Sequence, residues 1–110
     1  MGKIDTKNVL ESIINLLKDK YKPEKVILFG SFAWGIPNKE SDIDILIVKN
    51  TNLSFFKRLL EVRKLVSNAR KGYAFEPIVL TPKELEERLK MKDPFFTEIL
   101  RQGKVLYDAT

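Results

Sequence analysis

Two short apolar runs, each with polar residues at one end, constrain the fold of this chain more than any other feature. Val26–Phe29 leads directly into Gly30-Ser31, and after ten further residues Asp42-Ile43-Asp44 opens a second run that continues to Val48. Short runs of Val, Ile, Leu and Phe are typical of interior β-strands. We therefore expect two buried strands, each carrying polar groups at its tip.

The polar tips are suited to phosphate and metal chemistry. A strand that ends in Gly30 and Ser31 offers backbone N–H groups and a hydroxyl to a phosphate, especially where a helix begins. Asp42 and Asp44, two positions apart on a strand, would point to one face with backbones about 6.6 Å apart, and the pair would attract cations. Asp-x-Asp alone is usually a turn or a solvated strand end, and Gly-Ser is common in loops. The combination at this spacing predicts a metal and phosphate site.

The composition narrows the chemistry further. A chain of 110 residues supports one domain, expected here over residues 1–110, with a modest core. Cysteine and histidine are both absent, which excludes disulfides, thiolate zinc sites, Ser-His-Asp triads and histidine bases. Oxygen-only ligand sets suit Mg²⁺ or Mn²⁺. No membrane span or signal peptide is apparent in the sequence, so we expect a cytoplasmic protein without membrane contact.

The remaining patterns predict alternating helices and strands. We expect a helix capped by Thr6, a single turn over Ser31–Gly35, a polar loop over Ile36–Ser41, a long helix capped by Asn52 or Ser54 and reaching Arg70, a capping-box helix after Thr81, and a helix from Asp93-Pro94 to Gly103. The expected strands are Val26–Phe29, Asp42–Val48, Tyr73–Leu80 and Val105–Tyr107.

The long helix has an apolar and a basic set of residues. Its apolar side is predicted to hold Phe55, Phe56, Leu59, Leu60, Val62 and Val66, and its other side Lys57, Arg58, Arg63, Lys64, Arg70 and Lys71. The net charge of +5 favours a polyanionic partner such as a nucleotide, a nucleic acid or an acidic protein surface, although it also fits simple solubility. The basic side is accordingly either a partner surface or a solvated face.

Glu76 is the one ionised residue in the apolar stretch Tyr73–Leu80. Burying a lone carboxylate costs several kcal/mol, so Glu76 should lie at an edge of the sheet or join a charged cluster. Pro77 favours the edge, because proline cannot donate to a strand ladder. If the strand pairs beside Asp42–Val48 after a helical crossover, Glu76 can face the two aspartates. Such a cluster needs divalent cations, and two-metal displacement at phosphorus uses this arrangement.

These residues together resemble a known family. Phe29–Gly35, Ser41–Ile45 and a later strand carboxylate are similar to the motifs of DNA polymerase beta-like nucleotidyltransferases, most closely the minimal nucleotidyltransferases, and the likeness extends from Val26 to Asp108. The resemblance implies an α/β (α+β) fold of that type, a small mixed sheet flanked by helices. Family members usually carry Asp where this chain has Glu76.

The resemblance also implies roles for the motif residues. Gly30 and Ser31 would bind the nucleotide triphosphate, while Asp42, Asp44 and Glu76 would be the catalytic and metal-binding residues. Asp42 and Asp44 would hold two Mg²⁺ ions, with Mn²⁺ as an alternative metal, and Glu76 would orient or deprotonate the acceptor hydroxyl. The nucleotide would be ATP or another nucleoside triphosphate.

Three hypotheses about function follow. Small members of the family resemble antitoxins that modify a HEPN-type ribonuclease toxin, so the leading hypothesis is Mg²⁺-dependent transfer of AMP from ATP to a hydroxyl of such a partner protein. The alternative is a protein with the same fold that neutralises its partner by binding alone. In a third, the basic helix binds nucleic acid and the acceptor is a 3′ hydroxyl. The sequence leaves the acceptor and self-association, including a homo-oligomer, open.

Overall fold

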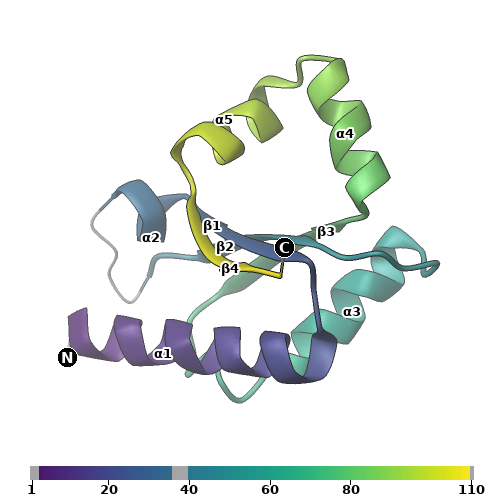
Figure 1. The fold of residues 1–110 in the computed structure, drawn as a ribbon. Coiled ribbons are helices and arrows are strands. Elements are labelled where there is room, and N and C mark those ends of the chain that lie inside the picture. Colours follow the sequence, from purple (N-terminus) through teal and green to yellow (C-terminus); the bar gives the residue numbers. More distant parts are fainter. Residues whose placement is uncertain (1–2, 36–39, 110) are drawn as a thin grey trace.

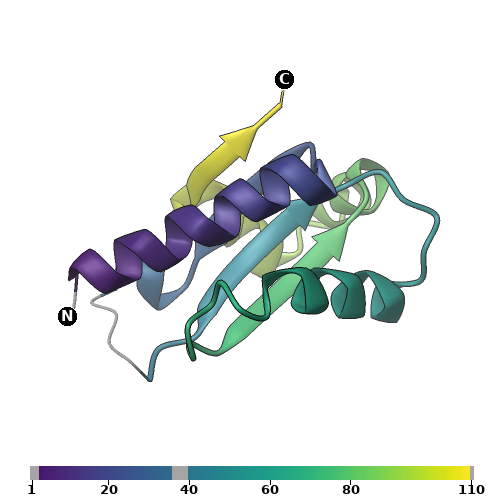
Figure 2. The ribbon, with the colours of Figure 1, turned by 90° about the horizontal axis from the view of Figure 1, so that it is seen from below.

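The chain folds into one four-stranded sheet with helices on both faces (Figures 1 and 2). The computed structural model describes residues 3–35 and 40–109. The strands are β1 (Lys25–Phe29), β2 (Ile43–Val48), β3 (Phe75–Leu80) and β4 (Lys104–Asp108), in the spatial order β3-β2-β1-β4. β1 is antiparallel to β2 and to β4, whereas β2 and β3 are parallel. The expected small mixed sheet flanked by helices is confirmed.

The helices divide between the two faces of the sheet. Helix α1 (Lys3–Leu16), its π-helical continuation η1 (Leu17–Tyr21) and α3 (Phe55–Val66) cover one face, and α4 (Pro82–Lys90) and α5 (Pro94–Gln102) lie on the other (Figure 1). The short helix α2 (Ser31–Trp34) follows β1 directly. In the described part of the chain, no helix combines the length and apolarity that crossing a membrane requires.

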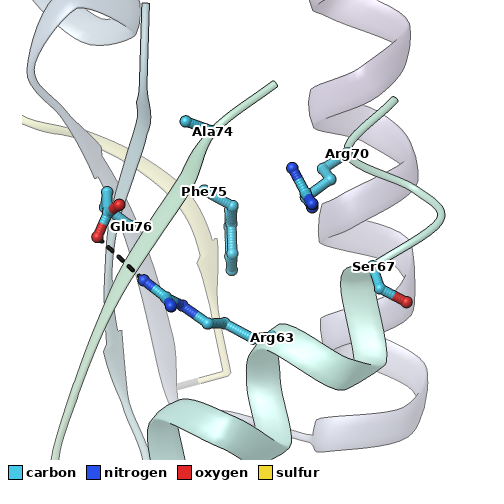
Figure 3. A pocket seen from close by; sticks show the side chains of 6 residues that line it. All are labelled: Arg63, Ser67, Arg70, Ala74, Phe75 and Glu76. Atoms are coloured by element: carbon cyan, nitrogen blue, oxygen red, sulfur yellow. Dashed lines mark hydrogen bonds and ion pairs between the residues drawn. The ribbon is translucent and has the colours of Figure 1, made fainter. Parts of the chain in front are cut away.

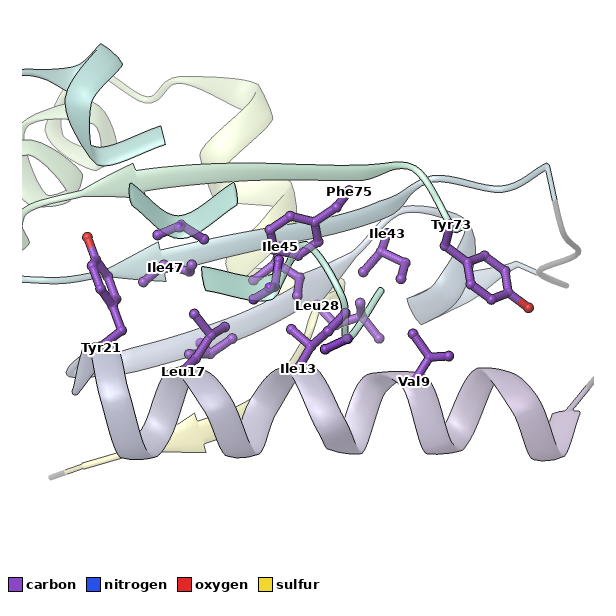
Figure 4. Packing of buried hydrophobic residues seen from close by; sticks show 14 of the residues in the cluster. Val9, Ile13, Leu17, Tyr21, Leu28, Ile43, Ile45, Ile47, Tyr73 and Phe75 are labelled. Atoms are coloured by element: carbon purple, nitrogen blue, oxygen red, sulfur yellow. The ribbon is translucent and has the colours of Figure 1, made fainter. Parts of the chain in front are cut away.

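The alternation of side chains along the strands builds two cores. Ile43, Ile45 and Ile47 of β2 pack against α1, where apolar residues recur at helical spacing (Figure 4). Leu46 points to the opposite face and packs with residues of α5. Since both faces of β2 are covered, its sequence reads as an uninterrupted apolar run after Asp44.

Several local predictions are confirmed by side-chain caps. Thr81 and Glu84 form the expected capping box at the start of α4. Asp93 caps α5 by accepting from the backbone N–H groups of Phe95 and Phe96. Of the two candidates for α3, Ser54 is the N-cap.

Other boundaries differ from the prediction. Thr6 does not cap α1, because that helix already begins at Lys3 and carries Thr6 inside it. Helix α3 ends at Val66, four residues before Arg70, and the chain then makes turns up to Gly72. Asp42 immediately precedes β2, and β3 begins at Phe75 instead of Tyr73. Of the polar loop expected over Ile36–Ser41, residues 36–39 lie outside the described part.

The predicted faces of α3 are wrong in part. Arg58 is only 6% exposed, whereas Phe56 is 63% exposed and Leu60 50%. At 3.6 residues per turn, positions two apart lie about 200° round a helix, so Phe56 and Leu60 point away from the side formed by Arg58, Val62 and Val66. Position along the helix, more than residue type, therefore decides which side chains reach the sheet.

Arg58 is compensated where it is buried. Its guanidinium donates to the backbone oxygens of Leu53 at 2.8 Å and Val79 at 3.1 Å, and to both carboxylate oxygens of Glu84, at 2.7 and 3.2 Å. The bonds from Arg58 hold the pKa of Glu84 below its ordinary value, against a smaller opposing effect of burial. This pair ties α3 to the junction between β3 and α4.

Replacing Glu84 with Gln should lower the free energy of unfolding by about 1–2 kcal/mol at neutral pH, because the half-exposed carboxylate bonds a buried cation. The pKa of Glu84 is lower in the folded state, so its contribution is present above the unfolded-state pKa and disappears as the pH falls through the folded-state value. Denaturant titrations at neutral and acidic pH measure this difference. Glu86→Gln, which removes an exposed i,i+4 pair with Lys90, should cost less than about 0.5 kcal/mol; equal costs for the two variants would contradict this role.

Candidate functional site

The turn after β1 depends on a glycine. Gly30 has φ +74° and ψ −155°, a conformation that residues with a Cβ rarely adopt, and it forms the N-cap of α2. Its carbonyl oxygen accepts from the backbone N–H groups of Ala33 at 2.9 Å and Trp34 at 3.0 Å. Ser31, the first residue of α2, is exposed to solvent. The predicted helical turn after Gly30 is therefore confirmed.

Asp44 lies directly against this turn. In the antiparallel ladder Asp44 is the partner of Phe29, the residue before Gly30. A Cβ added to Gly30 would overlap the Asp44 carboxylate, so glycine is required here both for its backbone angles and for space. The structure thus brings the Gly-Ser turn and the second aspartate together, although they are separated in the sequence.

Glu76 lies on the neighbouring strand at the same level. The parallel register pairs Asp44 with Glu76, and the two side chains share one face of the sheet because partners in register point the same way. β3 is an edge strand, so Pro77 loses no ladder partner on its outer side. The edge position expected for Glu76 is thus observed, and the register also places its backbone beside that of Asp44.

Negative charge accumulates around Asp44. Burial raises the pKa of the Asp44 carboxyl, and the charges of Asp42 and Glu76 raise it further. Asp42 is exposed and Asp44 half-buried. The two aspartates offer the oxygen ligands that Mg²⁺ and Mn²⁺ prefer, and a cation there would offset the carboxylate repulsion that adds to the effect of burial on the pKa of Asp44. These residues fit a divalent cation.

The carboxylate of Glu76 forms an ion pair with an arginine and does not join the two aspartates. Glu76 accepts from the guanidinium of Arg63 on α3 at 3.2 Å (Figure 3), and both side chains are about half exposed. Among residues 3–35 and 40–109, no three acidic side chains gather closely enough to hold one metal ion. This differs from the expected convergence of Asp42, Asp44 and Glu76, and Glu76 is instead paired with the Arg63 cation at the edge of the sheet.

A pocket of about 260 Å³ opens beside Glu76. It lies between the end of α3 and the start of β3 and is lined by Arg63, Ser67, Arg70, Ala74, Phe75 and Glu76 (Figure 3). The sequence alone predicts only that Arg63 and Arg70 belong to the basic side of the long helix. The α3 crossover, which returns the chain to β3 alongside β2, is what brings them to Glu76.

Comparison with known proteins identifies the family of this chain. The model of the family described as "Polymerase beta, Nucleotidyltransferase" matches residues 11–110. Two curated relatives come from Methanocaldococcus jannaschii. "Putative protein adenylyltransferase MJ0604" is 31% identical, and the match covers 94% of this chain and 100% of that relative. "Putative protein adenylyltransferase MJ1305" is 32% identical, and the match covers 92% of this chain and 71% of that relative.

A solved structure shares the fold. The chain is similar, with a TM-score of 0.57 and 24% identity, to a chain in "Crystal structure of the toxin-antitoxin with AMP-PNP". The match covers 89% of this chain and 72% of that one. At this identity the likeness supports the arrangement of strands and helices.

Gly30→Ala should displace the Asp44 carboxylate, because the added Cβ occupies its place. The displaced carboxylate would be better solvated, so its pKa should fall toward the ordinary value, which carboxyl ¹³C NMR titration measures. Gly72→Ala is the matched control: Gly72 has φ +85° but an added Cβ meets open space. Both variants should lose stability through the positive φ, by about 1–3 kcal/mol at Gly30, whose angles lie in a region that is nearly restricted to glycine, and by about 1–2 kcal/mol at Gly72. A pKa of Asp44 that is unchanged in Gly30→Ala, or equally changed in both, would contradict the contact.

Proposed function

This chain belongs to the polymerase beta nucleotidyltransferase family, and we propose that it transfers AMP from ATP to a hydroxyl group of a partner protein, with pyrophosphate as the leaving group. One observation carries the proposal: Asp44 lies between the Gly30 turn on one side and Glu76 on the other. A triphosphate, its cations and an acceptor hydroxyl need neighbouring positions, and these three groups supply them.

The names of the relatives support the choice of substrate. Both curated relatives are named protein adenylyltransferases, and one is matched over its whole length. The structural neighbour is a toxin-antitoxin assembly crystallised with AMP-PNP, an ATP analogue. We propose on this basis that the nucleotide is ATP and that this chain acts as the antitoxin of a toxin protein. That the toxin is of HEPN type is proposed from the resemblance of the motifs to those of minimal nucleotidyltransferases.

The residues of the chain would divide the reaction among them. The turn at Gly30 and Ser31 would bind the triphosphate, and Asp42 and Asp44 would hold the divalent cations. Mg²⁺, when bound, would supply positive charge to the phosphates and to the leaving pyrophosphate. The acceptor oxygen forms a bond to the α-phosphorus while the bond from that phosphorus to the departing pyrophosphate oxygen breaks. Glu76, beside the acceptor, would take the hydroxyl proton.

Neutralisation by binding alone is the second candidate function. It is favoured by the ion pair between Glu76 and Arg63, which turns the third carboxylate away from Asp42 and Asp44. A protein that keeps the fold without using Glu76 in chemistry could tolerate this arrangement. The two functions differ in whether the partner protein gains mass.

Asp42→Asn and Asp44→Asn should each reduce AMP transfer by at least about 100-fold, because the amide cannot replace a charged ligand of the cation. The assay is intact mass spectrometry of a HEPN-type partner protein after incubation with ATP and Mg²⁺. The pKa of Asp44 is raised in the folded state, so ionisation costs stability at neutral pH, and Asp44→Asn should melt at the same or a higher temperature. Full transfer by either variant would contradict the proposal.

Glu76→Ala separates the two candidate functions. If Glu76 accepts the hydroxyl proton, the variant should lose about 100-fold or more in transfer while still binding the partner. Arg63→Gln removes the ion pair without removing the Glu76 carboxylate, and so tests the contribution of the ion pair separately. Neutralisation of the partner by Glu76→Ala as effective as that of the wild type, with no added mass, would support binding alone.

A further inference from the structure

The pocket beside Glu76 holds more positive charge than the proposed reaction uses. We call it the α3–β3 pocket, defined by Arg63, Ser67, Arg70, Ala74, Phe75 and Glu76. Two guanidinium groups face one carboxylate there, so its lining carries a net charge of one positive unit. A side chain hydroxyl, that of Ser67, adds a further hydrogen-bonding group.

Both arginines are held in place and retain donors. Arg63 is fixed by its bond to Glu76 at 3.2 Å, and Arg70 by its bond to the backbone oxygen of Tyr73 at 2.7 Å. A guanidinium has five N–H donors, so each arginine keeps several beyond these bonds. Donors fixed before binding favour planar anions such as carboxylates, because little side-chain entropy remains to be lost.

The pocket lies between α3 and β3, at the β3 edge of the sheet. β2 separates β3 from β1, and it is β1 that leads into the Gly30 turn, so the pocket is not part of the triphosphate position. It shares Glu76 with the position proposed for the acceptor hydroxyl. A protein that presents a hydroxyl to Glu76 at this sheet edge would place its flanking residues over the pocket.

We propose that the α3–β3 pocket binds an acidic side chain of the acceptor protein, close to the hydroxyl that receives AMP. This inference rests on the proposed function and adds a substrate preference to it. A volume of about 260 Å³ is large enough to admit an Asp or Glu side chain and falls below the usual range for a drug-sized ligand, about 300–1,000 Å³.

The test compares two synthetic peptides, one with a tyrosine flanked by glutamates and one with the same tyrosine flanked by glutamines. Arginine Nε–H signals in ¹⁵N NMR report binding without any ATP or transfer. We expect the glutamate peptide to bind at least about tenfold more tightly, as one charge-assisted hydrogen bond allows, and to shift the signals of Arg63 and Arg70.

Variants then locate the binding. Arg70→Gln should weaken binding of the glutamate peptide about tenfold. Since Arg70 also bonds the Tyr73 backbone, Ser67→Asp is a second variant, which leaves both arginines in place and adds a repelling charge. Lys57→Gln is the matched control: it makes the same charge change on an exposed residue of α3 outside the pocket, and it should bind as the wild type does.

Equal affinity for the two peptides, or an equal loss in Lys57→Gln and Arg70→Gln, would overturn the inference. Tighter binding of a single-stranded RNA oligomer that depends on Arg63 and Arg70 would do so too, since it would make the pocket a nucleic-acid contact. Failure of this inference can be distinguished from failure of the proposed function. AMP transfer to the partner without a peptide preference refutes the pocket assignment alone, and a peptide preference without transfer refutes the transfer alone.

Discussion

The parallel pairing of β2 with β3 is the constraint on which the rest of the structure depends. Parallel strands begin at the same end of a sheet, so the chain needs a crossover between them. Helix α3 provides this crossover between β2 and β3. The register aligns Asp44 with Glu76. A slip of one residue would turn Glu76 to the opposite face, where α1 and α3 pack, so the apolar core of β2 and β3 fixes the position of the acidic side chains.

Negative charge is concentrated around Asp44 and is only partly neutralised. Asp44 is confined between the Gly30 turn and the neighbouring strand, and its raised pKa reflects burial and two nearby carboxylates. Glu76 is paired with Arg63 at the outer edge. The fold therefore tolerates an unfavourable arrangement at Asp44, which is common where a site must attract a cation and a substrate. The arginine beside Glu76 connects this site to the α3–β3 pocket.

Much of this architecture could be predicted from the sequence because its signals are local. The capping box at Thr81, the cap at Asp93 and the apolar run after Asp44 each depend on a few adjacent residues. The motif of Gly30, Ser31, Asp42 and Asp44 predicted the family, which the comparisons confirm. The roles of those residues, and that of Glu76, remain predictions.

The misses at Arg58 and Arg63 involve partners distant in the sequence. Arg58 could not be placed in the core because Glu84, which compensates its charge, lies 26 positions away. The pairing of Arg63 with Glu76 depends on where the α3 crossover ends, and no periodicity in the helix marks it. Thr6 resembles a cap in isolation, but the helix begins earlier. Local patterns thus predicted the elements, while contacts between elements required the structure.

We propose that the carboxylates of Asp44, on β2, and of Asp42, just before it, act together with a divalent cation to hold a triphosphate at the Gly30 turn. Isothermal titration of AMP-PNP into the protein, with Mg²⁺ and again with EDTA in its place, tests this most directly. We expect heat of binding with Mg²⁺ and its loss with EDTA. Binding of the same affinity in EDTA, or no binding in either solution, would contradict the claim.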